Sequence, residues 1–209
     1  MMRVVIASQN PNKIRECKSI MSEVDSFFSG VEFLSLAELG IYEDVEENGQ
    51  TFAENAKIKA RAAAKHCSDI VLADDSGLAV DALGGAPGVY SARYGGEHGN
   101  DAANNARLLR ELASVAQSER TAHFCCTIAC VLPDGHELLS EGRCDGLILD
   151  APRGKGGFGY DPLFYLPERG MTMAEMAPQE KNAVSHRARA LKSMAEMLRP
   201  ILEEQYADK

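Results

Sequence analysis

The stretch Asp69-Ile70-Val71-Leu72-Ala73-Asp74-Asp75-Ser76-Gly77 indicates the fold class of this chain. Its apolar part predicts a short buried strand over residues 69–73, and two carboxylates follow at once. In open α/β sheets, ligands bind beyond the carboxyl ends of the strands. Adjacent carboxylates at such a place can hold Mg²⁺, and one of them can act as a general base on water. The alternative is a plain turn, because Asp, Ser and Gly are all good turn formers.

The composition is that of an ordinary globular protein. The chain has 209 residues, 22 Lys and Arg against 31 Asp and Glu, a net charge of −9, and 45% hydrophobic residues. We expect one domain over residues 1–209. The acidic balance argues against binding to a nucleic-acid backbone. We expect no membrane partner, because no apolar run approaches the roughly 18 residues that a span needs. The opening residues do not resemble a signal peptide, so we expect a cytoplasmic protein with reduced cysteines.

Strand and helix signals alternate along the chain, which indicates an α/β fold. A strand over 3–8 precedes a helix that begins near Asn12. A second helix begins at Thr51, where Thr51-x-x-Glu54 has the form of a capping box. Further on, the pattern predicts a helix over residues 100–114 and a hairpin of two strands over 121–132 and 136–144. A final helix is predicted over about 185–204.

The turn after the first strand carries groups that suit a phosphate. A hydroxyl, side-chain amides and a lysine stand together at a helix start, in the run Ser8, Gln9, Asn10, Pro11, Asn12 and Lys13. The run does not match the Walker pattern G-x-x-x-x-G-K-[ST], so it is not a P-loop. A polar turn that caps the helix is the alternative.

The last third of the chain is basic and rich in glycine. In Gly154–Asp161 the glycines let backbone amides approach an anion, and Phe158 or Tyr160 could stack on a base. Lys181 and the segment Ser185–Arg189 add cationic donors near a helix start. A hairpin turn and a solvated basic face are the respective alternatives.

Two other groups of residues, a zinc site and a catalytic triad, do not match the sequence patterns that such sites have. His123 and the nearby cysteines do not have zinc-site spacing. A triad of Ser76, His186 and an aspartate would lack the G-x-S-x-G elbow.

Taken together, these motifs resemble the inosine triphosphate pyrophosphatase family. The resemblance covers nearly the whole chain in the right order, but relatives usually read A-T-G-N-x-G-K where this chain has Ala7-Ser8-Gln9-Asn10-Pro11-Asn12-Lys13. The other matching blocks are Thr51–Ala60, Ala73–Leu78, Gly84–Tyr94, Gly156–Pro162 and Lys181–Arg187.

The resemblance implies a fold and an activity. The fold would be α/β, a long twisted mixed β-sheet flanked by helices, with two lobes around a central cleft, in a homodimer. The activity would be Mg²⁺-dependent hydrolysis of ITP, dITP and XTP, a class of non-standard purine nucleoside triphosphates, to the monophosphate and pyrophosphate. Such an enzyme cleanses the nucleotide pool.

The reaction demands an oriented water and charge neutralisation. We assign Asp75 as the catalytic carboxylate, acting as the general base or orienting the water, and Lys59 as a catalytic residue that neutralises the triphosphate together with Lys13. Glu46 and Asp75 are the expected Mg²⁺ ligands. Asp74 and Glu47 are the alternative carboxylates. The residues expected to bind the triphosphate are Ser8, Gln9, Asn10, Pro11, Asn12, Lys13 and Ser76.

By the same resemblance, Phe158 stacks on the purine within a group formed by Phe158, Gly159, Tyr160, Asp161, Lys181, His186 and Arg187. Arg187 can only donate hydrogen bonds. It would therefore satisfy a 6-oxo group and leave the 6-amino group of adenine unmatched. Two other functions stay open: a different Mg²⁺-dependent phosphate hydrolase, which would release orthophosphate, and a nucleotide sensor, which would release its ligand intact.

Overall fold

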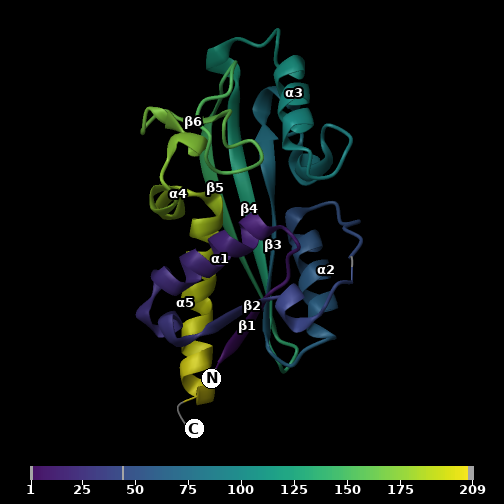
Figure 1. Cartoon of the computed structure of the whole chain (residues 1–209), viewed down its shortest axis with the longest axis vertical. Coiled ribbons are helices and arrows are strands. Elements are labelled where there is room, and N and C mark those ends of the chain that lie inside the picture. Colours follow the sequence, from purple (N-terminus) through teal and green to yellow (C-terminus); the bar gives the residue numbers. More distant parts are fainter. Residues whose placement is uncertain (1, 44, 207–209) are drawn as a thin grey trace. The chain divides into compact units, whose positions relative to one another are not determined.

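A computed structural model describes residues 2–43 and 45–206. A seven-stranded sheet has the order β2-β1-β3-β4-β5-β6-β7 (Figure 1). β1 is parallel to both of its neighbours, whereas β6 is antiparallel to β5 and to β7, so the sheet is mixed. The predicted α/β fold with a mixed sheet flanked by helices is confirmed. The strands are β1 Arg3–Ile6, β2 Glu32–Ser35, β3 Ile70–Val80, β4 Thr121–Val131, β5 Glu137–Ile148, β6 Phe164–Leu166 and β7 Met171–Thr172. The helices are α1 Pro11–Val24, α2 Phe52–Ala64, α3 Asp101–Glu111, α4 Pro178–Val184 and α5 His186–Tyr206.

The residues group into two compact units, each built from separate stretches of the chain. Unit 1 comprises the described residues within Met1–Asp75, Cys126–Gly142 and Arg187–Lys209. Unit 2 comprises Ser76–Cys125 and Arg143–His186. The expectation of a single domain over residues 1–209 stays a prediction.

Unit 1 has helices on both faces of its strands (Figure 1). In β1, Val4 and Ile6 pack in one hydrophobic cluster with buried residues of α1 and α5. Val5, which lies between them, packs in another cluster with Ala56 and Ala60 of α2. Successive residues of a strand point to opposite faces of the sheet. The same alternation runs along the parallel neighbour β3, so each of its residues can be assigned to one of the two faces.

Unit 2 has a core of its own. Leu78 of β3 and Leu108 of α3 are fully buried in it, and the rings of Phe124 and Phe164 lie 4.5 Å apart between centroids. Aromatic pairs at this separation add to the stabilisation from buried area. This core fixes α3 against the unit's strands.

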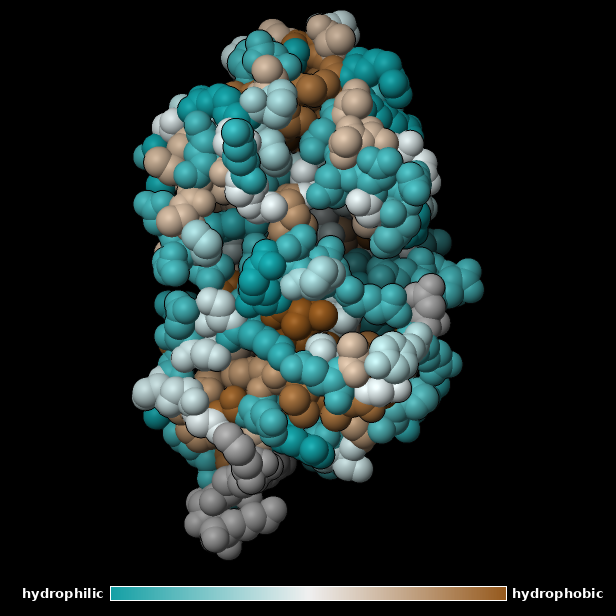
Figure 2. All heavy atoms as spheres, viewed as in Figure 1, coloured by the Kyte–Doolittle hydropathy of each residue, from teal (hydrophilic) through white to brown (hydrophobic). Residues whose placement is uncertain are grey.

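The face of the molecule drawn in Figure 2 is mostly polar. On the face drawn in Figure 2, hydrophilic side chains cover most of the surface, and hydrophobic ones show in smaller patches. Tyr42 and Tyr90 are large hydrophobic residues that are exposed. Among the residues that the structure describes, no helix combines the length and the apolar character that crossing a bilayer requires.

One strand prediction was wrong in its extent. β3 does not end at Ala73 but continues to Val80, so Asp74-Asp75-Ser76-Gly77 is neither a turn nor a strand end. The reason lies in the pairing. The register with β1 ends where Ile6 meets Leu72, while β3 runs on with β4 as its other neighbour. The acidic pair therefore stands in mid-strand, where the shorter strand beside it has stopped.

The end of the chain also differs from the prediction. The helix α4 was not predicted, and Lys181 lies within it. Ser185 ends α4, and its backbone N–H donates to the carbonyl oxygen of Lys181. The predicted final helix is confirmed as α5, which begins at His186. The hairpin was predicted correctly, but β5 extends through Ile148 as one strand.

Candidate active site

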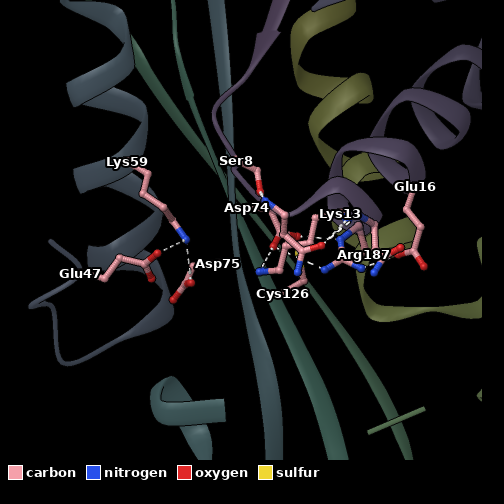
Figure 3. A network of polar contacts seen from close by, with 11 residues as sticks. Ser8, Lys13, Glu16, Glu47, Lys59, Asp74, Asp75, Cys126 and Arg187 are labelled. Carbon is pink, nitrogen blue, oxygen red and sulfur yellow. Dashed lines mark hydrogen bonds and ion pairs between the residues drawn. The ribbon is translucent and has the colours of Figure 1, made fainter. Parts of the chain in front are cut away.

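Asp74 and Asp75 point to opposite faces of β3 (Figure 3). Val71, Ala73 and Asp75 are alternate residues of β3, so they point to the same face of the strand. On this face Val71 and Ala73 pack in one hydrophobic cluster with buried residues of α2. Asp74 follows Ile70 and Leu72, which pack with α1 and α5. The two neighbouring carboxylates therefore meet different partners, and each has a different electrostatic environment.

On the α2 side, Lys59 connects two carboxylates. Its Nζ lies 2.9 Å from Oδ1 of Asp75 and 3.2 Å from Oε1 of Glu47. α2 presents Lys59 from its second half, and the helix begins as predicted, with Thr51 accepting a hydrogen bond from the backbone N–H of Glu54. This capped, alanine-rich helix is a rigid element that holds the backbone of Lys59 in place.

Asp75 has the properties of a base. Burial raises the pKa of its carboxyl above the ordinary value, and this effect outweighs the opposing charges of Lys59 and Lys13. Its second oxygen, Oδ2, is buried and has no hydrogen-bond partner within the described residues. A buried carboxylate oxygen without a partner is unusual, and it leaves one hard oxygen for a water or a cation.

On the other face, Asp74 is held by two cations and a thiol. Its oxygens lie 2.6 Å from Nζ of Lys13 and 2.8 Å from Nε of Arg187, and the Sγ–H of Cys126 donates to Oδ2 at 3.0 Å. Burial alone would raise the pKa of Asp74, but Arg187 and Lys13 hold it well below the ordinary value. Asp74 is therefore an ionised member of a buried ion cluster.

The cluster around Asp74 includes a residue that the sequence analysis missed. Oε2 of Glu16 lies 2.5 Å from Nη1 of Arg187, which is only 1% exposed. Glu16 stands one turn after Lys13 on α1, so its spacing could have placed both on one helix face. Burial lowers the pKa of Lys13, but the charges of Asp74 and Asp75, together with the hydrogen bond to Asp74, outweigh burial and leave this pKa raised.

The predicted phosphate turn forms the start of α1. Asn10 is its N-cap, and its Oδ1 accepts from the backbone N–H groups of Asn12 and Lys13. Ser8 accepts through Oγ from the N–H of Asn10. The structure therefore confirms that these residues cap the helix, and it brings Lys13 to Asp74. Their binding of a phosphate stays a prediction.

The remaining predicted residues of this turn lie at its edge. Gln9 and Pro11 are exposed, and the side chain of Gln9 donates to the carbonyl oxygen of Glu43 at 3.3 Å. Asn12 accepts from Arg15 at 2.7 Å. Ser76 follows Asp75 in β3 and is half-buried.

A second group of predicted residues lies in unit 2. Oδ2 of Asp161 accepts from the backbone N–H of Phe158 at 3.0 Å and lies 2.5 Å from Nζ of Lys181. This ammonium group also stands 4.8 Å from the centroid of the Phe158 ring, within the range of a cation–π contact. His186 stacks on Phe124, with ring centroids 4.7 Å apart.

Two further residues of the predicted base-binding group have structural contacts. The backbone N–H of Gly159 donates to Asp101, and its carbonyl oxygen accepts from Asn105. Tyr160 is buried in the core of unit 2 and donates its hydroxyl to the carbonyl oxygen of Ser91.

Arg187 belongs to unit 1, where its guanidinium pairs with Asp74 and Glu16, and its role beside the base stays a prediction. Within unit 2, the structure brings together Phe158, Asp161 and Lys181, and within unit 1 it brings together Asp74, Lys13 and Arg187.

The carboxylate next to Asp75 is Glu47, since Glu46 is exposed whereas Glu47 reaches Lys59. Within the described residues, no three or more His, Cys, Asp or Glu side chains are arranged to hold a metal ion. Mg²⁺ keeps several waters and shares substrate phosphates, so one or two carboxylates suffice for it.

The sequence matches known proteins over nearly its full length. The family model described as the Ham1 family matches residues 4–197. The chain belongs to the Ham1 family. A protein of Geobacillus kaustophilus named dITP/XTP pyrophosphatase is 53% identical over 202 residues, which are 97% of each chain. A protein of the same name from Clostridium perfringens is 50% identical, covering 97% of this chain and all of its relative.

Solved structures agree with this membership. The structure of a HAM1 protein from Coxiella burnetii matches with a TM-score of 0.83 at 42% identity, over 96% of this chain and 100% of the other. At this identity and coverage the likeness extends to the whole fold of this Ham1 family member.

Proposed function

We propose that this Ham1 family protein hydrolyses non-standard purine nucleoside triphosphates, among them ITP, dITP and XTP, to the monophosphate and pyrophosphate. Its full-length similarity to proteins named dITP/XTP pyrophosphatase supports this activity. The observation that carries the proposal is Asp75, a buried carboxylate of raised pKa that has one oxygen on Lys59 and no hydrogen-bond partner for the other within the described residues.

The attack on the α-phosphorus needs a positioned water. Asp75 accepts a proton from that water through Oδ2, while Lys59 holds Oδ1 and keeps the carboxylate oriented. The raised pKa makes Asp75 a stronger base than an exposed aspartate. Lys59 and Lys13 supply positive charge for the triphosphate as negative charge builds on the leaving pyrophosphate.

A Mg²⁺ ion fits the carboxylates beside Lys59. Oδ2 of Asp75 has a second lone pair besides the one that accepts the water's proton, so this oxygen and the carboxylate of Glu47 are hard ligands for the ion. We propose Glu47 in place of Glu46 as the second ligand. When bound, Mg²⁺ supplies charge neutralisation to the phosphate oxygens. Asp74 is less suited to this role, because two cations and a thiol already surround it. We propose instead that Asp74 positions Lys13.

Base recognition belongs to the group in unit 2. Phe158 offers a ring for stacking, and Lys181, held by Asp161, can only donate hydrogen bonds. A donor of this kind matches a 6-oxo group and leaves adenine unsatisfied. His186 completes this group, and Arg187 keeps the proposed role of a second donor to the 6-oxo group.

The experiment that tests this function is a product analysis. Purified protein with Mg²⁺ is mixed separately with ITP, XTP, GTP and ATP, and pyrophosphate and orthophosphate are both quantified. We expect pyrophosphate and the monophosphate from ITP and XTP, with little from GTP or ATP. Orthophosphate as the product would show a different phosphate hydrolase, and tight binding without turnover would show a sensor.

Two further expectations are a homodimer, which the resemblance implies, and a cytoplasmic location. Light scattering tests the first, since a dimer would have twice the chain mass of 22.6 kDa. Fractionation of the source cells tests the second.

A further inference from the structure

Two side chains of α3 hold one glycine of the loop that carries Phe158. Oδ2 of Asp101 accepts from the backbone N–H of Gly159 at 2.6 Å, and Nδ2 of Asn105 donates to its carbonyl oxygen at 2.9 Å. Asp101 and Asn105 stand four residues apart, so they project from one face of the helix. Both polar groups of the Gly159 backbone are thereby fixed by a single rigid element.

We infer that Asp101 and Asn105 are positioning residues for base recognition, and we name this pair the α3 clamp. The inference rests on the proposed function, because Phe158 is taken there as the ring that stacks on the purine. Gly159 directly follows Phe158, so the position of its peptide groups determines where the ring stands.

The loop needs such a clamp because its own sequence does not hold it. Gly154, Gly156 and Gly157 precede Phe158, and all three are exposed. Glycine-rich backbone has more conformational freedom to lose on ordering than any other. Gly159 itself has a φ of 63°, in the left-handed region where a side chain would be strained.

The contacts on either side of the clamp define the ring's place. The N–H of Phe158 is bound to Asp161, and the residue after Gly159, Tyr160, is anchored in the core by its hydroxyl. The α3 clamp holds the peptide groups between these two anchors. Asp101 also lies in the first turn of α3, where the helix dipole favours a carboxylate.

Asn105→Asp tests the clamp with a side chain of nearly the same size. It removes the donor and sets a carboxylate against the carbonyl oxygen of Gly159. Ala106→Asp is the matched control, because it adds the same charge at the next, exposed position of α3. Both variants are made in the full chain and compared by hydrogen exchange of the 154–161 amides, and by kcat and KM for ITP.

We expect exchange of these amides to be about tenfold faster in Asn105→Asp, and KM for ITP about tenfold higher, with kcat within about threefold. Ala106→Asp should leave both unchanged. Asn105→Gln, which keeps the donor, should recover part of the KM.

Unchanged hydrogen exchange of these amides in Asn105→Asp would refute the inference that the α3 clamp holds the loop. Faster exchange with an unchanged KM for ITP would refute the role of the α3 clamp in base recognition. Absence of ITP turnover in the unaltered chain would refute the proposed function instead, and the exchange comparison would still decide whether the clamp exists.

Discussion

Asp74 and Asp75 are adjacent in the sequence and both are buried, yet they differ in their partners and in the direction of their pKa shifts. Asp74 is enclosed by Lys13, Arg187 and Cys126, and its pKa is held low. Asp75 has one cation beside it and a raised pKa. The pleat of β3 produces this difference, because it turns consecutive side chains to opposite faces. The carboxylate of Asp74 is already neutralised by its cations, so it suits a structural role. The carboxylate of Asp75 has one buried oxygen without a hydrogen-bond partner within the described residues, so it suits a role in catalysis.

Asp75→Asn is expected to abolish turnover while the chain stays folded. The amide cannot accept a proton from water, and loss of a general base costs about 10²-fold or more in kcat. Pyrophosphate release from ITP measures the effect, and circular dichroism checks the fold. Asp145→Asn, at an exposed carboxylate of β5, serves as the control. A variant that keeps more than half of the activity would contradict the role of Asp75.

Arg187→Ala is expected to lower stability, in addition to its proposed effect on base selection. The guanidinium is buried and paired with Asp74 and Glu16. Removing it leaves two carboxylates without their main cation, which typically costs about 3–5 kcal/mol. Urea unfolding measures this loss against Arg199→Ala, whose ion pairs are half-exposed. Equal losses in the two variants would refute the structural role of Arg187, and an unchanged ITP-to-ATP ratio in a folded Arg187→Ala would refute its proposed role in base selection.

At the scale of elements, the sequence predicted most of the fold. Helix starts were predictable because caps are local: Thr51 and Asn100 each accept from the backbone of the first helical turn. The length of β3 was not predictable in this way. Asp, Ser and Gly favour turns locally, whereas pairing with a neighbouring strand is a long-range effect that overrides this preference.

The same distinction explains which parts of the candidate site were predictable. Lys59 and Asp75 carry motif signals, and the structure brings them together. The choice between Glu46 and Glu47 depended on the path of a segment without regular structure, and only the structure shows that Glu47 reaches Lys59. The clamp residues Asp101 and Asn105 act on a loop more than fifty positions away, so no local pattern points to them.

The end of β2 is tied to α1 by a pH-sensitive contact. Hydrogen bonds from Lys18 and from Ser35 lower the pKa of Glu38 to about 2, from an ordinary value of 4.5. Because the pKa is lowered in the folded state, this stabilisation is complete above about pH 4.5 and is lost as the pH falls towards 2. The Glu38 side chain is half-exposed, so solvent screening reduces its contribution to about 1 kcal/mol.

Glu38→Gln should therefore lower the free energy of unfolding at pH 7 by about 1 kcal/mol, and the difference from the unaltered chain should shrink towards pH 2. Urea unfolding at a series of pH values measures it. Glu203→Gln, at an exposed pair within α5, provides the control. A difference that stays constant with pH would show that the ionised carboxylate is not the stabilising form.

At the scale of the whole molecule, the two units carry different parts of the proposed reaction. Unit 1 holds the lysines and carboxylates assigned to the triphosphate, together with Arg187, and unit 2 holds the other groups assigned to the base, Phe158, Asp161, Lys181 and His186. Each unit gathers stretches that are far apart in the sequence. Substitutions in the two units should therefore change different kinetic quantities.

Two matched variants test this division. Lys59 in unit 1 and Lys181 in unit 2 are each paired with an aspartate, at 2.9 and 2.5 Å, so replacement by Met removes the same kind of contact in both. Lys59→Met should lower kcat for ITP and ATP alike by about 10²-fold, because neutralisation of the triphosphate does not depend on the base. Lys181→Met should instead lower the ratio of kcat/KM for ITP over ATP by about tenfold, because a donor that matches a 6-oxo group is lost. Equal changes of this ratio in both variants would mean that the units do not divide the work, and that base selection depends on the same lysines as the chemistry.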